Sequence, residues 1–193
     1  LAALAAQGLV SAVMVPDPLL CPAAMLAPHV DVCRPFKTHL LIDPARGAYA
    51  PSKHHRYEIR RAQRRCRVEI APLADWLDAW SALYAELVAR RGIGGVAAFS
   101  PAYFRMLAQL PGLAAFVALV DGACAGMALW FAADGVVYNH LGAANALGYA
   151  NGASFALYDA AIAHFAGCGV VNLGGGAGLA DDDGGGLAAF KRG

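Results

Sequence analysis

The chain has 193 residues, of which 59% are hydrophobic and 15% are charged, a composition that excludes an intrinsically disordered protein and suits one large domain with a sizeable core. Its formal net charge is only +1, yet residues 1–67 contain ten Lys and Arg and four Asp and Glu, a net charge of +6, whereas residues 68–193 carry −5. The basic N-terminal part indicates a partner that carries phosphates, anionic lipid or other acidic groups.

Residues 1–51 contain seven of the ten prolines, a density that disfavours long regular elements. Short strands are predicted at residues 9–15 and 38–42, with loops between them. Residues 1–15 are apolar but lack the basic start of a signal peptide. We interpret them as the interior of a domain whose beginning lies before this sequence.

The next segment, residues 52–67, is basic, with arginines that recur every four positions, as at Arg56 and Arg60. Ile59 and Ala62 mark an apolar side, so the spacing predicts a helix. This helix is either a solvated charged face or a phosphate-binding surface, because arginine grips phosphate through two parallel hydrogen bonds.

The remaining elements follow from hydrophobic periodicity and turn residues. Helices are predicted at residues 75–91, 100–110 and 152–165, and strands at residues 115–120, 124–132, 136–141 and 170–173. The Asp121-Gly122 pair interrupts a long apolar run, which favours a hairpin over an integral membrane segment. This order of elements predicts an α/β (α+β) fold, in which helices pack on the faces of a mixed sheet.

Cysteine usage argues against a bound metal. The chain has five cysteines, and no pair has the C-x-x-C spacing of zinc or redox sites. No metal site is therefore predicted, and free thiols fit a reducing cytoplasm best.

The most specific segment lies near the C-terminal end of the sequence. Strand 170–173 runs into three glycines, where a ligand or a second strand can approach because no Cβ would clash. An acidic run and a Phe-Lys pair follow. These residues are Gly174, Gly175, Gly176, Asp181, Asp182, Asp183, Phe190 and Lys191.

Four segments in this order resemble the FemAB-type branch of the GNAT acyltransferase superfamily, which includes peptidoglycan aminoacyltransferases. They are residues 8–20, 53–65, 151–154, and 173–176 with Phe190-Lys191. The resemblance implies a GNAT-like mixed, mostly antiparallel sheet flanked by helices. It also implies two GNAT-like halves: residues 1–51 as the end of the first, residues 52–67 as a basic connecting helix, and residues 68–193 as the acyltransferase domain.

Acyl transfer to an amine needs a base for the amine and a positive or hydrogen-bonding group for the oxyanion. The resemblance implies that Lys191 lies near the reacting groups, where it stabilises negative charge. On the strand at 136–141, His140 is the best-placed base and Tyr138 a donor to the oxyanion or the leaving group. In the acidic loop, Asp183 is the candidate to hold the amine, although nothing selects it over its two neighbours. Each of these residues also has a purely structural interpretation.

Substrate binding is expected at the arginines, at the start of helix 152–165 and at the glycine strand. The residues are Arg56, Arg60, Asn151, Ser154, Gly174, Gly175 and Gly176, with Asn151 and Ser154 expected to cap that helix. Residues 142–152 lack the Arg/Gln-x-x-Gly-x-Gly/Ala pattern with which acyl-CoA-binding members of the superfamily cradle pyrophosphate. Aminoacyl-tRNA is therefore favoured over acyl-CoA as the donor, and no tightly bound cofactor is expected.

These expectations combine into an acyl- or aminoacyltransferase that forms an amide on an amine-bearing acceptor, such as a UDP-linked or lipid-linked cell-wall precursor or a polysaccharide. Two alternatives stay open. One is an acetyl-CoA-dependent N-acetyltransferase, and the other is a non-catalytic GNAT-fold module that binds an anionic polymer or RNA through the basic helix. We expect a cytoplasmic protein, with attachment at the inner membrane face and a homodimer as further options.

Overall fold

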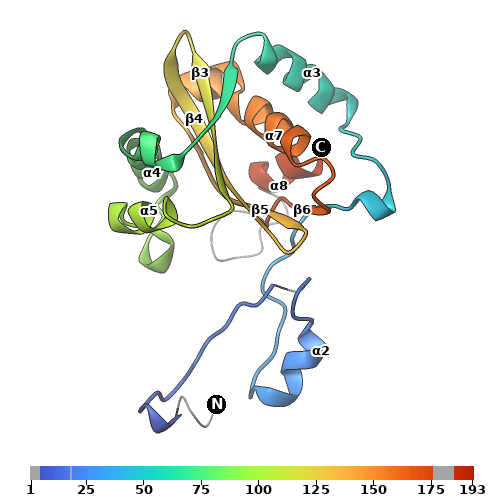
Figure 1. The fold of residues 1–193 in the computed structure, drawn as a ribbon, viewed down its shortest axis with the longest axis vertical. Coiled ribbons are helices and arrows are strands. Elements are labelled where there is room, and N and C mark those ends of the chain that lie inside the picture. The colour runs from blue at the N-terminus through green and yellow to red at the C-terminus, as the bar shows by residue number, and fades with distance from the viewer. Residues whose placement is uncertain (1–4, 18, 176–184) are drawn as a thin grey trace. The chain divides into compact units, whose positions relative to one another are not determined.

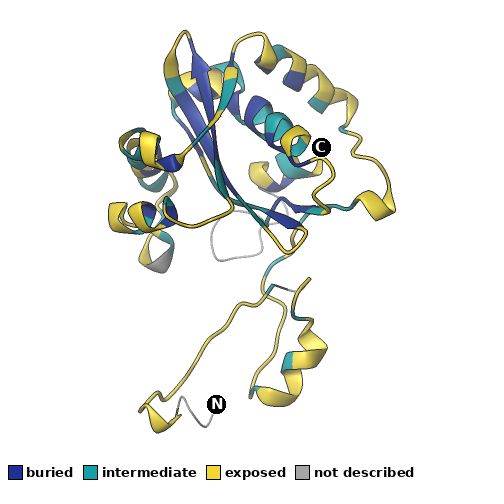
Figure 2. Ribbon diagram, in the orientation of Figure 1, coloured by how far each residue is buried: buried dark blue, intermediate teal, exposed yellow. Residues whose placement is uncertain are grey.

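A computed structural model of the chain describes residues 5–17, 19–175 and 185–193 (Figure 1). The chain divides into two compact units, Leu1–Lys37 and Thr38–Gly193. In the first unit, the short helix α2 (Ala23–Leu26) runs into the 3-10 turn η1 (Ala27–His29). The strand predicted at residues 9–15 is wrong, since this segment forms no strand and its apolar side chains are exposed (Figure 2).

The second unit contains a six-stranded sheet with the order β1-β6-β5-β4-β3-β2. Its strands are β1 (Leu41–Ile42), β2 (Arg67–Ala71), β3 (Leu113–Val120), β4 (Ala123–Ala133), β5 (Val136–Ala144) and β6 (Val170–Asn172). Neighbouring strands are antiparallel except β5 and β6, which are parallel. The predicted mixed, mostly antiparallel sheet is therefore confirmed, and β1 confirms the strand expected at residues 38–42.

Helices cover both faces of this sheet (Figure 1). One face carries α4 (Leu77–Arg91) and α5 (Pro101–Leu107), and the other carries α3 (Lys53–Gln63), α7 (Ala153–His164) and α8 (Gly186–Arg192). Short 3-10 turns complete the unit: η2 (Pro44–Arg46), η3 (Leu73–Trp76) and η4 (Gly95–Ala97). Within the described residues, every helix is too short or too polar to cross a bilayer.

Two hydrophobic clusters form the core, one on each face of the sheet, and the central strands are buried between them (Figure 2). Side chains of β3 alternate between the clusters, with Phe116 in the first and Val117 in the second. This follows from the two-residue period of a strand, whose successive side chains point to opposite faces. Strands apolar at every position thus lie between two helical layers.

Turn and cap residues set most element boundaries as predicted. Asp121 and Gly122 both have positive φ (50° and 82°) and form the tight β3–β4 turn. Ser100 caps α5 by accepting a hydrogen bond from the backbone N–H of Tyr103. The basic helix is confirmed at Lys53–Gln63, although the chain leaves it before Arg67, where β2 begins.

The region before α7 contains a helix that the sequence did not predict, α6 (Ala146–Asn151). Gly152 follows in the left-handed conformation (φ 72°) and separates it from α7. Gly148 lets α6 pack directly on β4, because a Cβ at this position would overlap the carbonyl of Ala125. The predicted single helix at 152–165 is therefore α7, preceded by a short independent turn of helix.

The predicted division at residues 51 and 67 stays a prediction. The compact unit that begins at Thr38 includes β1, which pairs with β6 at the edge of the sheet.

Candidate functional site

The parallel strands β5 and β6 separate partway along β5. Their pairing covers only Val136, Val137 and Tyr138, opposite Val170–Asn172. β5 continues to Ala144 and keeps its pairing with β4 on the other edge. Among the described residues, no strand pairs with the β6-facing edge of β5 over residues 139–144. An open edge of this kind presents backbone N–H and C=O groups that can bind an extended ligand.

A β-bulge lies at the point of separation. Leu129 pairs with Leu141 and Trp130 with Asn139, so His140 is the extra residue on β5. Bulges redirect side chains and are common beside active sites. Here the bulge turns His140 toward the face covered by α4 and α5.

His140 is enclosed by aromatic rings and held by one polar contact. Its Nε2 lies 2.9 Å from the hydroxyl oxygen of Tyr103 on α5, and its ring packs edge-on against Phe131. Burial lowers the pKa of His140 below its usual 6.5 and raises the pKa of Tyr103 above its usual 10. At neutral pH the imidazole is therefore uncharged and the phenol keeps its proton.

Lys191 approaches the same stretch of β5 from the opposite face. Its Nζ donates a hydrogen bond to the carbonyl of Gly175 (2.9 Å). A Cβ built on Gly174 would lie 3.3 Å from this Nζ and 3.7 Å from the backbone oxygen of Asn139. Gly174 also has a positive φ of 76°. Glycine is needed here both for the backbone conformation and for the close meeting of α8, β6 and β5.

A set of polar side chains that the sequence did not single out surrounds this meeting point. The Tyr158 hydroxyl on α7 donates to Asn139 Oδ1 (2.7 Å), and burial raises the pKa of Tyr158. Asn172, only 2% exposed, accepts from the backbone N–H of Gly174 (2.8 Å), and its Nδ2 lies 3.1 Å from Nδ1 of His39. The sequence signal for these residues is an asparagine within an apolar strand, because buried polar groups in proteins almost always form hydrogen bonds.

The other predicted catalytic residues are placed as follows. Tyr138 is half-buried at the last position of β5 that pairs with β6. Asp183 lies outside the described residues, as does Gly176. Lys191 and Gly174 are brought together, whereas no described contact joins either to His140.

Of the predicted substrate-binding residues, Gly174 and Gly175 lie at that meeting point beside Lys191. Arg56 and Arg60 are exposed on α3, where an Arg56 guanidinium N–H donates to the carbonyl of Pro51 (2.6 Å). The expected capping by Asn151 and Ser154 is wrong. Asn145 caps α6, Gly152 stands at the cap of α7 without a side-chain bond, and Asn151 instead donates to the carbonyl of Leu147 (2.9 Å).

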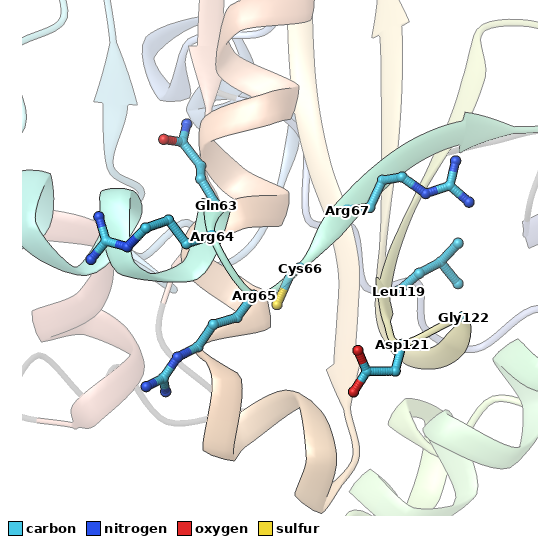
Figure 3. Close-up of a pocket in the computed structure, with 8 residues that line it drawn as sticks. All are labelled: Gln63, Arg64, Arg65, Cys66, Arg67, Leu119, Asp121 and Gly122. Atoms are coloured by element: carbon cyan, nitrogen blue, oxygen red, sulfur yellow. The ribbon is translucent and has the colours of Figure 1, made fainter.

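A shallow depression of about 430 Å³ lies where α3 ends and β2 begins (Figure 3). Three arginines line it, but their guanidinium groups point away from one another, and Arg67 pairs with Glu69. The lining residues are Gln63, Arg64, Arg65, Cys66, Arg67, Leu119, Asp121 and Gly122. This arrangement does not focus positive charge on one bound group. In the described part of the chain, no three His, Cys, Asp or Glu residues gather in a way that could hold a metal ion.

The chain resembles a known protein family and several solved structures. Residues 52–192 match the model of the acetyltransferase (GNAT) domain family. Among solved structures, FemX has a TM-score of 0.59 at 14% identity, with 73% of this chain and 53% of that chain covered. The C-terminal domain (DUF2156) of a putative lysylphosphatidylglycerol synthetase from Agrobacterium fabrum has a TM-score of 0.56 at 18% identity, covering 70% and 45%.

A conserved protein of unknown function from Bacteroides thetaiotaomicron gives a TM-score of 0.59 at 17% identity, covering 80% and 54%. The chain thus spans about half the length of these structures. No curated protein matches the sequence significantly. The match to the family model covers most of the sequence, so the chain belongs to the GNAT acetyltransferase domain family.

Proposed function

We propose that the chain transfers an acyl group from an activated donor to a primary amine where β5 and β6 separate. The observation that carries this proposal is the open edge of β5 beyond Tyr138, with Lys191 on one side and His140 on the other. An extended donor can bind along this edge, and its carbonyl then lies between a cation and a neutral base.

In the proposed reaction, the amine nitrogen attacks the acyl carbonyl carbon, the bond from that carbon to the donor's sulfur or oxygen breaks, and the proton lost by the amine is finally delivered through His140 to the departing thiol or hydroxyl. Tyr103 hands its proton to Nε2 of His140 and takes the amine proton in exchange. Burial keeps the imidazole uncharged at neutral pH, so one ring nitrogen has a lone pair that can accept a proton, and Nε2 lies within hydrogen-bonding distance of the Tyr103 hydroxyl. The Lys191 ammonium stabilises the oxyanion that forms on the carbonyl.

For the donor, we propose an aminoacyl ester of the FemAB type ahead of acyl-CoA. The N-terminus of α6 is capped by its own Asn145, and α6 has only six residues. The start of α7 packs against α3, since a Cβ on Gly152 would lie 3.4 Å from the Cβ of Ala62. Neither helix start is therefore arranged as an amide cradle for pyrophosphate. The resemblance to the FemAB-type branch implies a cell-wall peptide as acceptor, and the name of the putative lysylphosphatidylglycerol synthetase supports a lipid headgroup.

Acetyl-CoA is the second candidate donor, because the matching family is described as an acetyltransferase domain. The full chain should be incubated with radiolabelled acetyl-CoA or with charged tRNA, each against a UDP-linked muropeptide, an amine-bearing lipid and a polyamine. Amide products are then identified by mass spectrometry, with the heat-denatured chain as control.

An amide formed only with charged tRNA supports the aminoacyltransferase. An amide formed only with acetyl-CoA keeps the acyl transfer and overturns the donor assignment. No amide with either donor contradicts the proposal and favours a module that binds anionic polymers through α3. That module would retain RNA in a gel-shift assay and lose it when Arg56 and Arg60 are replaced by glutamine.

A further inference from the structure

Three buried side-chain nitrogens have no acceptor among the described residues: Nε1 of Trp80, Nε1 of Trp130 and Nδ2 of Asn139. A buried donor without an acceptor lowers the stability of the fold, so each such group needs an explanation. One explanation is that the donor binds a ligand.

The two tryptophans are explained by enclosure. Trp80 and Trp130 are both 0% exposed and lie inside the two hydrophobic clusters. Trp130 packs against the rings of Tyr158 and Phe165. No ligand reaches either indole. Asn139 differs in its position. Its Nδ2 is buried as well, but the residue as a whole is partly exposed and is the first of β5 beyond its last pair with β6, at the open edge of the strand.

The orientation of the Asn139 amide is fixed by Tyr158. The phenol donates to Oδ1, and burial raises the pKa of Tyr158, so the hydroxyl stays protonated and remains a donor. The Tyr158 ring is itself held edge-on by Trp130 and Phe190, at centroid distances of 5.4 and 4.9 Å. Nδ2 is therefore turned away from Tyr158 and keeps two N–H donors for another group.

The neighbourhood of Asn139 indicates what that group is. Its backbone oxygen and Nζ of Lys191 both lie within 4 Å of the point where a Cβ on Gly174 would stand. The Asn139 side chain lies on the face of the sheet that α7 and α8 cover, and Lys191 belongs to α8. A neutral donor and a cation thus lie on the same side of the open edge of β5.

We propose that Nδ2 of Asn139 donates a hydrogen bond to the carbonyl oxygen of the acyl donor, and that Tyr158 is the positioning residue that aims it. This inference rests on the proposed function. As the amine attacks, the carbonyl π electrons move onto oxygen, and the N–H bond to that oxygen strengthens without proton transfer. Removal of one such donor lowers kcat by roughly 10²–10³-fold.

The first test is Asn139→Asp, which preserves the shape of the side chain and the acceptor for Tyr158 but removes both N–H donors. We expect kcat to fall about 10²-fold while KM for the donor changes little. Tyr158→Phe should lower kcat by a smaller factor. The double variant Asn139→Leu/Tyr158→Phe removes both polar partners together, and we expect it to unfold at the wild-type temperature or above while its kcat is as low as that of Asn139→Asp.

The second test does not depend on turnover. In the ¹⁵N-labelled full chain, the side-chain amide signals of Asn139 are those missing from the spectrum of Asn139→Asp. The probes are S-acetyl-N-acetylcysteamine, a minimal thioester, and alanine methyl ester, a minimal aminoacyl ester. We expect one of them to shift these signals.

The two proposals fail separately. If the signals shift but no amide product is found, Asn139 binds acyl carbonyls and the proposed reaction is at fault. If amide is formed at an unchanged rate by Asn139→Asp and neither probe shifts the signals, the role of Asn139 is overturned.

Discussion

The His140 side chain lies on one face of β5 and Lys191 of α8 lies on the other. Their surroundings differ in polarity. The imidazole lies among aromatic rings, which disfavour its charged form. The ammonium instead donates to the backbone carbonyl of Gly175, which follows β6 in the chain. This contrast matches a division of labour in which a neutral base takes a proton while a cation meets a developing oxyanion.

The pH dependence of the reaction tests the base. Because burial lowers the pKa of His140 below 6.5, the wild-type kcat/KM should rise with pH along a limb centred below 6.5, separate from any limb at higher pH at which the amine substrate loses its proton. His140→Gln should lower kcat/KM by roughly 10²–10⁴-fold and abolish that limb. A limb that survives in His140→Gln would assign the titration to another group.

Folding stability provides an independent reading of the same pKa. In the unfolded chain His140 has a pKa near 6.5, whereas burial lowers its pKa in the folded chain. The unfolded state therefore binds more protons as the pH falls through this value. Urea melts of wild type should therefore lose stability below pH 6.5 more steeply than those of His140→Gln. Equal slopes would show that the folded imidazole titrates normally.

At the scale of elements, the short helix α6 depends on close packing against β4. Gly148→Ala places a Cβ against the carbonyl of Ala125, so we expect a loss of about 1–3 kcal/mol in the free energy of unfolding, despite the better helix propensity of alanine. Gly94→Ala is the matched control, because no atom lies within 4 Å of its added Cβ and its φ is negative. Denaturant melts compare the two, and equal stability would contradict the packing.

Hydrophobic periodicity predicts the elements whose own sequences carry an apolar run or an apolar stripe. The β3–β4 hairpin was found because the Asp121-Gly122 turn sits between two apolar runs, and α4 because its apolar stripe repeats at helical spacing. α6 was missed because its sequence is small and mixed, and its packing relies on Gly148 of α6 meeting Ala125 of β4. The strand at residues 9–15 was predicted from apolar content, although no strand forms there.

The candidate site was harder to predict, because it is made by pairing between distant residues. Lys191 and Gly174 were anticipated through their motif, and the structure brings them together. Asn139 and Tyr158 were not, since a hydrogen bond between β5 and α7 leaves no local pattern. The bulge at His140 likewise follows from strand register, which a single sequence does not reveal.

At the scale of the molecule, the boundary of the second compact unit can be tested by truncation. Removal of residues 1–37 should leave the melting temperature within a few degrees of the full chain, because the compact unit begins at Thr38. Removal of residues 1–51 also deletes β1 and the backbone bonds of Leu40 to Leu173 and Gly174 (2.9 and 3.2 Å). We expect this to cost about 3 kcal/mol, or roughly 10 °C in Tm. Equal melting of the two truncations would place the boundary at residue 51.

The proposal that acyl transfer takes place beside the open edge of β5 is tested most directly by Lys191→Met, assayed by the initial rate of amide formation with whichever donor and acceptor prove active. Lys53→Met is the matched control, because it removes an exposed lysine at the start of α3. The account predicts that kcat falls roughly 10²–10³-fold in Lys191→Met, with KM for the donor nearly unchanged, and stays at the wild-type value in Lys53→Met. A wild-type rate in Lys191→Met would contradict it.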